Sequence, residues 1–174
     1  MKTTASTFAL LFCSVSAYLS TTTLNSHRSI TPVKLAVLSD LSEPEQRVYS
    51  LVEDLHTCRF PFRIVVIGNG AILESTSILG PQMKLNKSPK SEEYLITLAN
   101  EDQSFEFHMK PSQVAKVIFT QKANLPDAGS GMKILRFMNE KGDPMCSLIL
   151  GEKSDAGNLW FQSMIAKYGQ EIQL

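Results

Sequence analysis

Large apolar side chains occupy every second position in the middle of the chain, between residues 104 and 110: Phe105, Phe107 and Met109. A two-residue period predicts a strand with one buried face. The intervening side chains, which include His108, are expected to point away from the apolar layer, towards solvent or a ligand. Of these two interpretations, a histidine on a solvated sheet face is the plainer one.

Six other segments have the β-branched, aromatic or alternating composition that is typical of strands. They are residues 63–67, 71–78, 94–99, 114–121, 132–138 and 145–150. Gly68-Asn69-Gly70 joins the first two segments and predicts a tight hairpin turn. The polar stretch 84–93, with three lysines and one proline, is expected to be a loop or a mobile flap.

Two segments have helical patterns. Ser42 and Glu45 are spaced as in a capping box, and Pro44 suits the first helical turn. An apolar stripe at helical spacing follows, made of Val48, Leu51, Val52 and Leu55. A final helix is expected to begin with Asp155 as its cap. Its apolar residues are Leu159, Trp160, Met164 and Ile165.

These elements together predict an α+β fold. Most of the connections between the expected strands are short enough for antiparallel neighbours. The expected architecture is a curved antiparallel β-sheet of about seven strands with flanking N- and C-terminal helices. No internal repeat is visible in the sequence.

The N-terminal segment has the composition of a targeting sequence. Residues 1–39 contain no Asp or Glu, and an apolar run, 8–13, precedes small residues at Val15 and Ala17. That run is too short to span a bilayer, so no stable membrane insertion is expected. The rest is basic and hydroxylated, and the whole resembles the bipartite presequence (signal plus transit peptide) of an alga with a secondary plastid. We therefore expect residues 1–39 to be removed, leaving a domain at 40–174 in the plastid; secretion or mitochondrial import are the alternatives.

Charge and cysteine content exclude several classes of function. Lys plus Arg and Asp plus Glu both number 17, so the chain lacks the positive charge of a nucleic-acid-binding protein. Cys58 and Cys146 are not part of a CxxC motif or a histidine cluster, so neither a zinc site nor a disulfide scaffold is expected. The sequence also shows no self-contained catalytic constellation.

Several segments resemble the HutX/ChuX haem-utilisation family, whose members are similar to one half of HemS. The resembling segments are 64–74, 107–110, 113–119 and 137–142 followed by Met145, within roughly residues 60–166. The resemblance implies a HemS/ChuX-like domain that binds haem or a related tetrapyrrole. It also implies a homodimer, because single-unit members pair to imitate the two-unit ones.

The resemblance further nominates site residues. It implies His108 as the first candidate ligand of the haem iron and Tyr94 as the second. Cations on neighbouring strands are candidates for the haem propionates, although each is also compatible with a solvated surface charge. These cations are Lys110, Lys116, Lys133 and Arg136.

Three functions follow from this resemblance and stay open at the level of sequence. The first is a haem-binding protein for buffering, trafficking or utilisation of haem inside the plastid. The second is a haem-degrading enzyme that uses an external reductant. The third is an assembly or interaction protein that has kept the fold without the ligand.

Overall fold

The computed structural model describes residues 38–68, 70–122 and 131–174. The chain divides into two units, Met1–Ile30 and Thr31–Leu174, and every described residue belongs to the second. Residues 1–37 of the expected presequence lie outside the described residues, and the presequence with its boundary at residue 39 stays a prediction.

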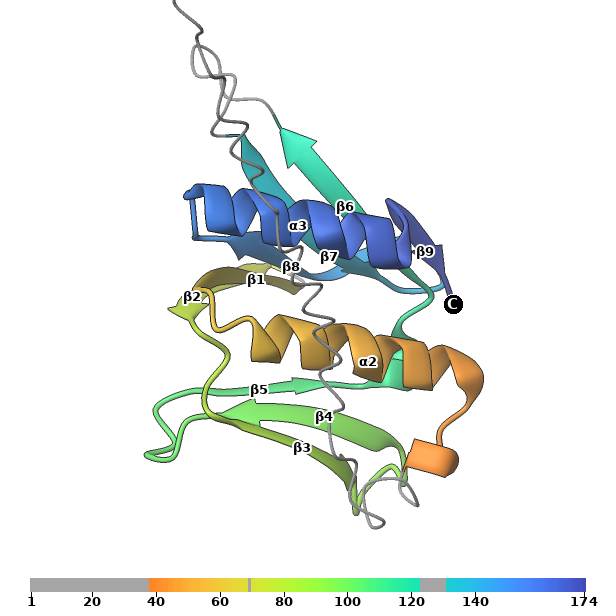
Figure 1. The fold of residues 1–174 in the computed structure, drawn as a ribbon. Coiled ribbons are helices and arrows are strands. Elements are labelled where there is room, and N and C mark those ends of the chain that lie inside the picture. Colours follow the sequence, from red (N-terminus) through yellow and green to blue (C-terminus); the bar gives the residue numbers. More distant parts are fainter. Residues whose placement is uncertain (1–37, 69, 123–130) are drawn as a thin grey trace, which may run out of the picture. The chain divides into compact units, whose positions relative to one another are not determined.

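The described residues form two sheets, here named sheet A and sheet B. Sheet A has the strand order β2-β1-β8-β7-β6-β9, and sheet B has the order β3-β4-β5. The strands of sheet A are β1 (Phe62–Gly68), β2 (Ala71–Ser77), β6 (Lys116–Lys122), β7 (Met132–Met138), β8 (Pro144–Leu150) and β9 (Glu171–Gln173). Those of sheet B are β3 (Gln82–Lys87), β4 (Tyr94–Ala99) and β5 (Glu106–Met109). Figure 1 traces the chain from the β1–β2 hairpin into sheet B and back into sheet A.

All strand pairs are antiparallel, so the predicted α+β antiparallel class is confirmed. The strands are divided between two sheets because β5 pairs only with β4 among the described strands. The short 3-10 helix η1 (Pro111–Gln113) follows β5 and leads the chain back to β6. A proline at its first position and the absence of a long apolar run explain why the strand pattern stops there.

Part of one expected loop is a strand. Residues 84–93 were expected to be a loop, but 84–87 belong to β3, which pairs with β4 along its whole length, and only 88–93 form a turn. Met83 and Leu85 supply the apolar alternation, and the three lysines conceal it in the sequence. Strand β9 had no counterpart in the expected set, because three residues are too few to show a period.

The helices are α2 (Glu43–Thr57) and α3 (Asp155–Tyr168). The predicted capping box of α2 is confirmed, since Glu45 Oε2 accepts hydrogen bonds from the Ser42 nitrogen and hydroxyl at 2.9 and 2.7 Å. The predicted cap of α3 is wrong by one residue. Ser154 is the N-cap, and its hydroxyl accepts a hydrogen bond from the Gly157 N–H. Serine and aspartate are both good caps, so the sequence alone does not separate them.

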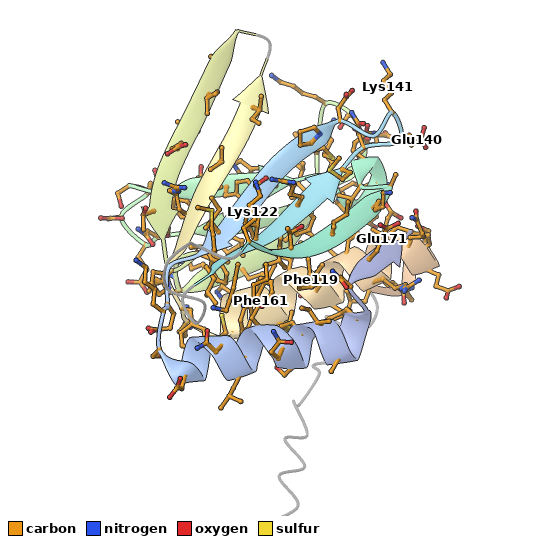
Figure 2. The ribbon with its side chains drawn as sticks, turned by 90° about the horizontal axis from the view of Figure 1, so that it is seen from above. Phe119, Lys122, Glu140, Lys141, Phe161 and Glu171 are labelled. Carbon is orange, nitrogen blue, oxygen red and sulfur yellow. The ribbon has the colours of Figure 1, made fainter. Side chains whose placement is uncertain are left out.

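A single hydrophobic core joins both sheets and both helices. Phe161 of α3 packs edge-on against Phe119 of β6, with ring centroids 5.7 Å apart, and Figure 2 shows the two rings beside each other. Leu159, expected among the apolar residues of this helix, is 71% exposed instead. The helices are also joined directly, because Asp54 of α2 accepts hydrogen bonds from Lys167 and Tyr168 of α3.

None of the helices in the described part of the chain is long and apolar enough to cross a bilayer.

Candidate functional site

His108 lies on β5, on the face of sheet B that points away from the core. Its register partner is Thr97 of β4, and Thr97 Oγ1 is 2.9 Å from His108 Nδ1. Thr97 is only 9% exposed, whereas the His108 side chain is 48% exposed. The hydrogen bond holds the imidazole through its inner nitrogen. The outer nitrogen, Nε2, lies 3.6 Å from Glu106 Oε2 and is accessible from solvent.

A shallow polar groove of about 310 Å³ surrounds His108. One apolar residue, Ala99, takes part in its lining. The other lining residues are polar or charged: Gln82, Lys84, Asn86, Thr97, Asn100, Glu101, Gln103, Glu106 and His108. This groove offers a nitrogen ligand for a metal but little apolar surface for a flat aromatic molecule.

Tyr94 is not on the His108 face. It opens β4, three positions before Thr97, and an odd separation along a strand puts the two side chains on opposite faces of the sheet. The Tyr94 hydroxyl donates a hydrogen bond to Asp40 Oδ2 at 3.0 Å, and this carboxylate raises the pKa of Tyr94. A phenolate is therefore disfavoured, and Tyr94 is a weaker candidate for iron ligation than His108.

Lys110 is already engaged by a neighbouring carboxylate. Its Nζ donates to Glu93 Oε2, while Ser112 and Gln113 of η1 donate to Glu93 Oε1. The Lys110 hydrogen bond is the largest cause that lowers the pKa of Glu93 to about 2. The arrangement ties the segment before β4 to η1, so Lys110 has a structural partner. Lys116 is similarly paired with Glu171, at 3.3 Å.

Arg136 lies on sheet A, in a wider groove on the face away from the helices. This groove has a volume of about 520 Å³ and lies across the strands β1, β8 and β7. Its apolar lining residues are Val65, Ile67, Met132, Ile134, Met138, Pro144 and Ile149. The charged ones are Arg63, Glu74, Lys122 and Arg136. Arg63 Nη1 is 4.0 Å from Glu74 Oε2, so this ion pair is loose and solvated.

The structure thus divides the expected site residues between two faces. The His108 face of sheet B carries His108 and Lys110, and the sheet A groove carries Arg136. Tyr94 lies on neither, and Lys133 lies on the opposite side of β7 from Arg136, buried beneath the helices. Sequence reasoning missed Thr97 and the apolar lining of the sheet A groove. The signal for the lining was present, since Met132, Ile134 and Met138 make β7 apolar on both faces.

Neither a protein-family model nor a curated protein matches the sequence. Solved structures do match it. A protein of Agrobacterium tumefaciens has a TM-score of 0.55 at 14% identity, over 75% of this chain and 76% of that one. The haem-binding protein ChuX has a TM-score of 0.54 at 14% identity, over 77% of this chain and 83% of that one. This chain has the ChuX fold.

The same fold is found in a longer enzyme. The haem-degrading enzyme ChuS of Escherichia coli O157:H7 matches with a TM-score of 0.51 at 14% identity, over 77% of this chain but only 39% of ChuS. Sequence identity at this level establishes the fold alone. The ChuX fold therefore serves both a haem-binding protein and a haem-degrading enzyme, and the function of this chain has to be argued from its own residues.

Proposed function

We propose that this protein binds haem and carries it, with His108 Nε2 as the protein ligand of the iron. The observation that supports this most directly is the hydrogen bond between Thr97 Oγ1 and His108 Nδ1. A metal-binding histidine usually has its second ring nitrogen held by a hydrogen bond, which fixes the tautomer and the ring orientation. With a proton on Nδ1 donated to Thr97, Nε2 keeps its lone pair and points to solvent.

The two faces described above fit haem only in combination. The His108 face supplies a ligand nitrogen but has almost no apolar surface, whereas haem is a large flat macrocycle with two carboxylates. The sheet A groove supplies the apolar lining, with Arg63 and Arg136 as partners for carboxylates. Bound haem would supply the redox and ligand chemistry of its iron, and the protein would orient it and shield it from water.

We further propose that two copies of the chain assemble to complete the site. In a twofold dimer, the His108 face of one copy can lie against the sheet A groove of its partner, and the symmetry axis creates two equal sites. The exposed apolar residues Ile67 and Ile72 at the end of the β1–β2 hairpin would lose their exposure in such an assembly. Each copy would then hold one haem.

Titration of the full chain with haem tests the proposal. Wild-type protein should give a saturable Soret band with a stoichiometry of one haem per chain, and His108→Ala should shift or flatten that band. His56→Gln is the matched control, because it removes a histidine from α2, outside both grooves. An unchanged spectrum for His108→Ala would exclude His108 as the ligand. Light scattering should give about twice the 19.3 kDa chain mass, and a monomer would exclude the shared site.

Haem degradation is the second candidate function, favoured by the fold that the chain shares with ChuS. Ascorbate and oxygen added to the haem complex separate the two candidates. If the protein is a carrier, the Soret band of the complex should decay no faster than that of free haem under the same conditions. If it is an enzyme, the band should decay faster and iron should be released. His108→Ala then reports whether the same ligand serves the degradation.

The expected location in a plastid is also a proposal. It depends on the composition of residues 1–39, nearly all of which are outside the described part of the chain. N-terminal sequencing of the protein from its native source should find a start between about Tyr18 and Asp40. A mature protein that still begins with Met1 would remove the argument for import.

A further inference from the structure

Lys133 is the only charged residue among the buried residues of the described part of the chain, with 4% of its surface exposed. It lies near the start of β7, on the helix-facing side, opposite Gln121 of β6. Lysine is almost never buried to this degree unless it has a partner. The sequence predicted a surface or ligand-contacting lysine here, and the surface alternative is wrong.

No carboxylate of the described residues forms an ion pair with Lys133, and no described side chain or carbonyl accepts a hydrogen bond from its ammonium group. The Lys133 Nζ atom is not among the fully buried polar atoms that lack a partner in the described residues, so the aliphatic stem is buried while the ammonium group keeps access to solvent. The ammonium group is therefore held in place by its buried stem and remains accessible to a small anion.

A cavity of about 300 Å³ adjoins this lysine. It lies at the ends of β1, β7 and β8 and includes the segment 151–153 that leads into α3. Its apolar surface comes from Met132, Ile149 and Leu150, and Lys133 forms part of its wall. The volume is at the lower end of the range for small-molecule sites.

The charged residues around the cavity are mainly cations. Arg63 and Lys153 line it together with Lys133, against one carboxylate, that of Glu152. Glu152 Oε1 accepts a hydrogen bond from the Ser154 N–H at 2.9 Å, and this contact lowers the pKa of Glu152. The carboxylate is thus directed at the start of α3, and the three cations are left with an excess of positive charge.

We propose that this cavity binds a small oxyanion, a carboxylate or a phosphate, with the Lys133 ammonium group as its counter-ion and Arg63 as a second contact. The proposal does not require haem binding. Arg63, Met132 and Ile149 line both this cavity and the sheet A groove. The oxyanion therefore has two possible sources, a free anion or a propionate of a haem bound in the adjoining groove, and the experiment separates them.

Thermal unfolding of the full chain in inorganic phosphate, against sodium chloride of equal ionic strength, tests the cavity without haem. Phosphate should raise Tm saturably, by roughly 5–10 °C at about 100 times its Kd. Lys133→Met should abolish this response, because it keeps an unbranched side chain of similar length and removes the ammonium group. Lys141→Met is the matched control, since Lys141 lies exposed in the β7–β8 turn (Figure 2), and it should leave the phosphate response unchanged.

Haem titrations with and without phosphate identify the source. Competition that disappears in Lys133→Met assigns the cavity to a haem propionate, and independent binding of the two ligands assigns it to a free anion. The proposal is overturned if phosphate stabilises wild type and Lys133→Met equally. It is also overturned if phosphate does not stabilise the wild type and the haem affinity of Lys133→Met equals that of the wild type. Absence of haem binding with an intact phosphate response would refute the proposed function and leave this inference standing.

Discussion

The outer faces of the two sheets differ in what they offer a ligand. The sheet B face carries a histidine whose ring is held by a buried threonine, in a groove with one apolar lining residue. The sheet A face carries an apolar groove with two arginines, and no histidine lines it. Each face has the part that the other lacks. The comparison teaches that a ligating residue and its apolar pocket need not lie on the same surface of one chain.

In sheet B, adjacent residues of one strand face the core and the candidate site. Leu98 and Thr97 are adjacent on β4, but Leu98 points into the core and Thr97 points to the His108 face. We expect Leu98→Ala to lower the free energy of unfolding by about 2–5 kcal/mol, because it leaves a cavity in the core. His108→Ala should cost less than about 1 kcal/mol, since the side chain is half exposed. Denaturant unfolding measures both, and equal costs would mean that the two faces of sheet B are assigned the wrong way round.

The arginine on the sheet A face should contribute to haem affinity without contributing to ligation. Loss of a charge-assisted hydrogen bond costs about 1.5–3 kcal/mol, so Arg136→Met should weaken haem binding at least about tenfold. The Soret maximum should stay where it is in wild type, because the iron ligand is unchanged. Lys116→Met serves as the control, as its ammonium group is already paired with Glu171. A shifted Soret band in Arg136→Met would contradict the division of roles between the faces.

The threonine that orients His108 should have a smaller but specific effect. Thr97→Val keeps the shape of the side chain and removes the hydrogen bond to Nδ1. Loss of such a second contact to a metal-binding histidine lowers affinity by about 10–100-fold, and we expect the lower end for a half-exposed ring. Thr120→Val, on β6, is the matched control. Haem titration should find the control unchanged, and an equal loss in both variants would show that Thr97 acts through sheet packing alone.

The sequence predicted most of the fold and only part of the candidate site. Apolar runs rich in β-branched or aromatic residues, as in β1 and β7, were sufficient for the strands, and the capping residues were sufficient for the start of α2. Division into two sheets depends on which distant strands pair, and no local pattern records that β1 pairs with β8. Strand β3 was missed because its lysines suggested a loop.

The same limit applies to the site. The alternation around His108 correctly predicted that it points away from the core, which the structure confirms. Tyr94 and Arg136 were grouped with it by resemblance, and the structure separates all three because strand parity and sheet membership decide which side chains meet.

The smallest expected effect concerns the Glu93 contact beside the His108 face. The pKa of Glu93 is lowered from 4.5 to about 2. A carboxyl with a lowered folded-state pKa stabilises the fold above its unfolded pKa, and this contribution is lost as the pH falls through the folded value. The difference in stability between wild type and Glu93→Gln should therefore be constant above about pH 5 and shrink towards pH 2. Unfolding curves across this range provide the test, and a difference independent of pH would mean that Glu93 does not hold Lys110 as described.

The pairing of β1 with β8 has a consequence for how quickly the chain reaches its native state. Strands β6, β7 and β8 are consecutive in the sequence and can pair early through local contacts. Strand β1 can pair with β8 only when the long intervening segment, which contains sheet B, has folded back. Closing so long a loop costs conformational entropy before the strands gain any contact, and this slows folding. Refolding on a scale of milliseconds to seconds is therefore expected. Until β1 arrives, the free edge of β8 is open to strands of other molecules, and stopped-flow refolding at increasing protein concentration should reveal transient association in that interval.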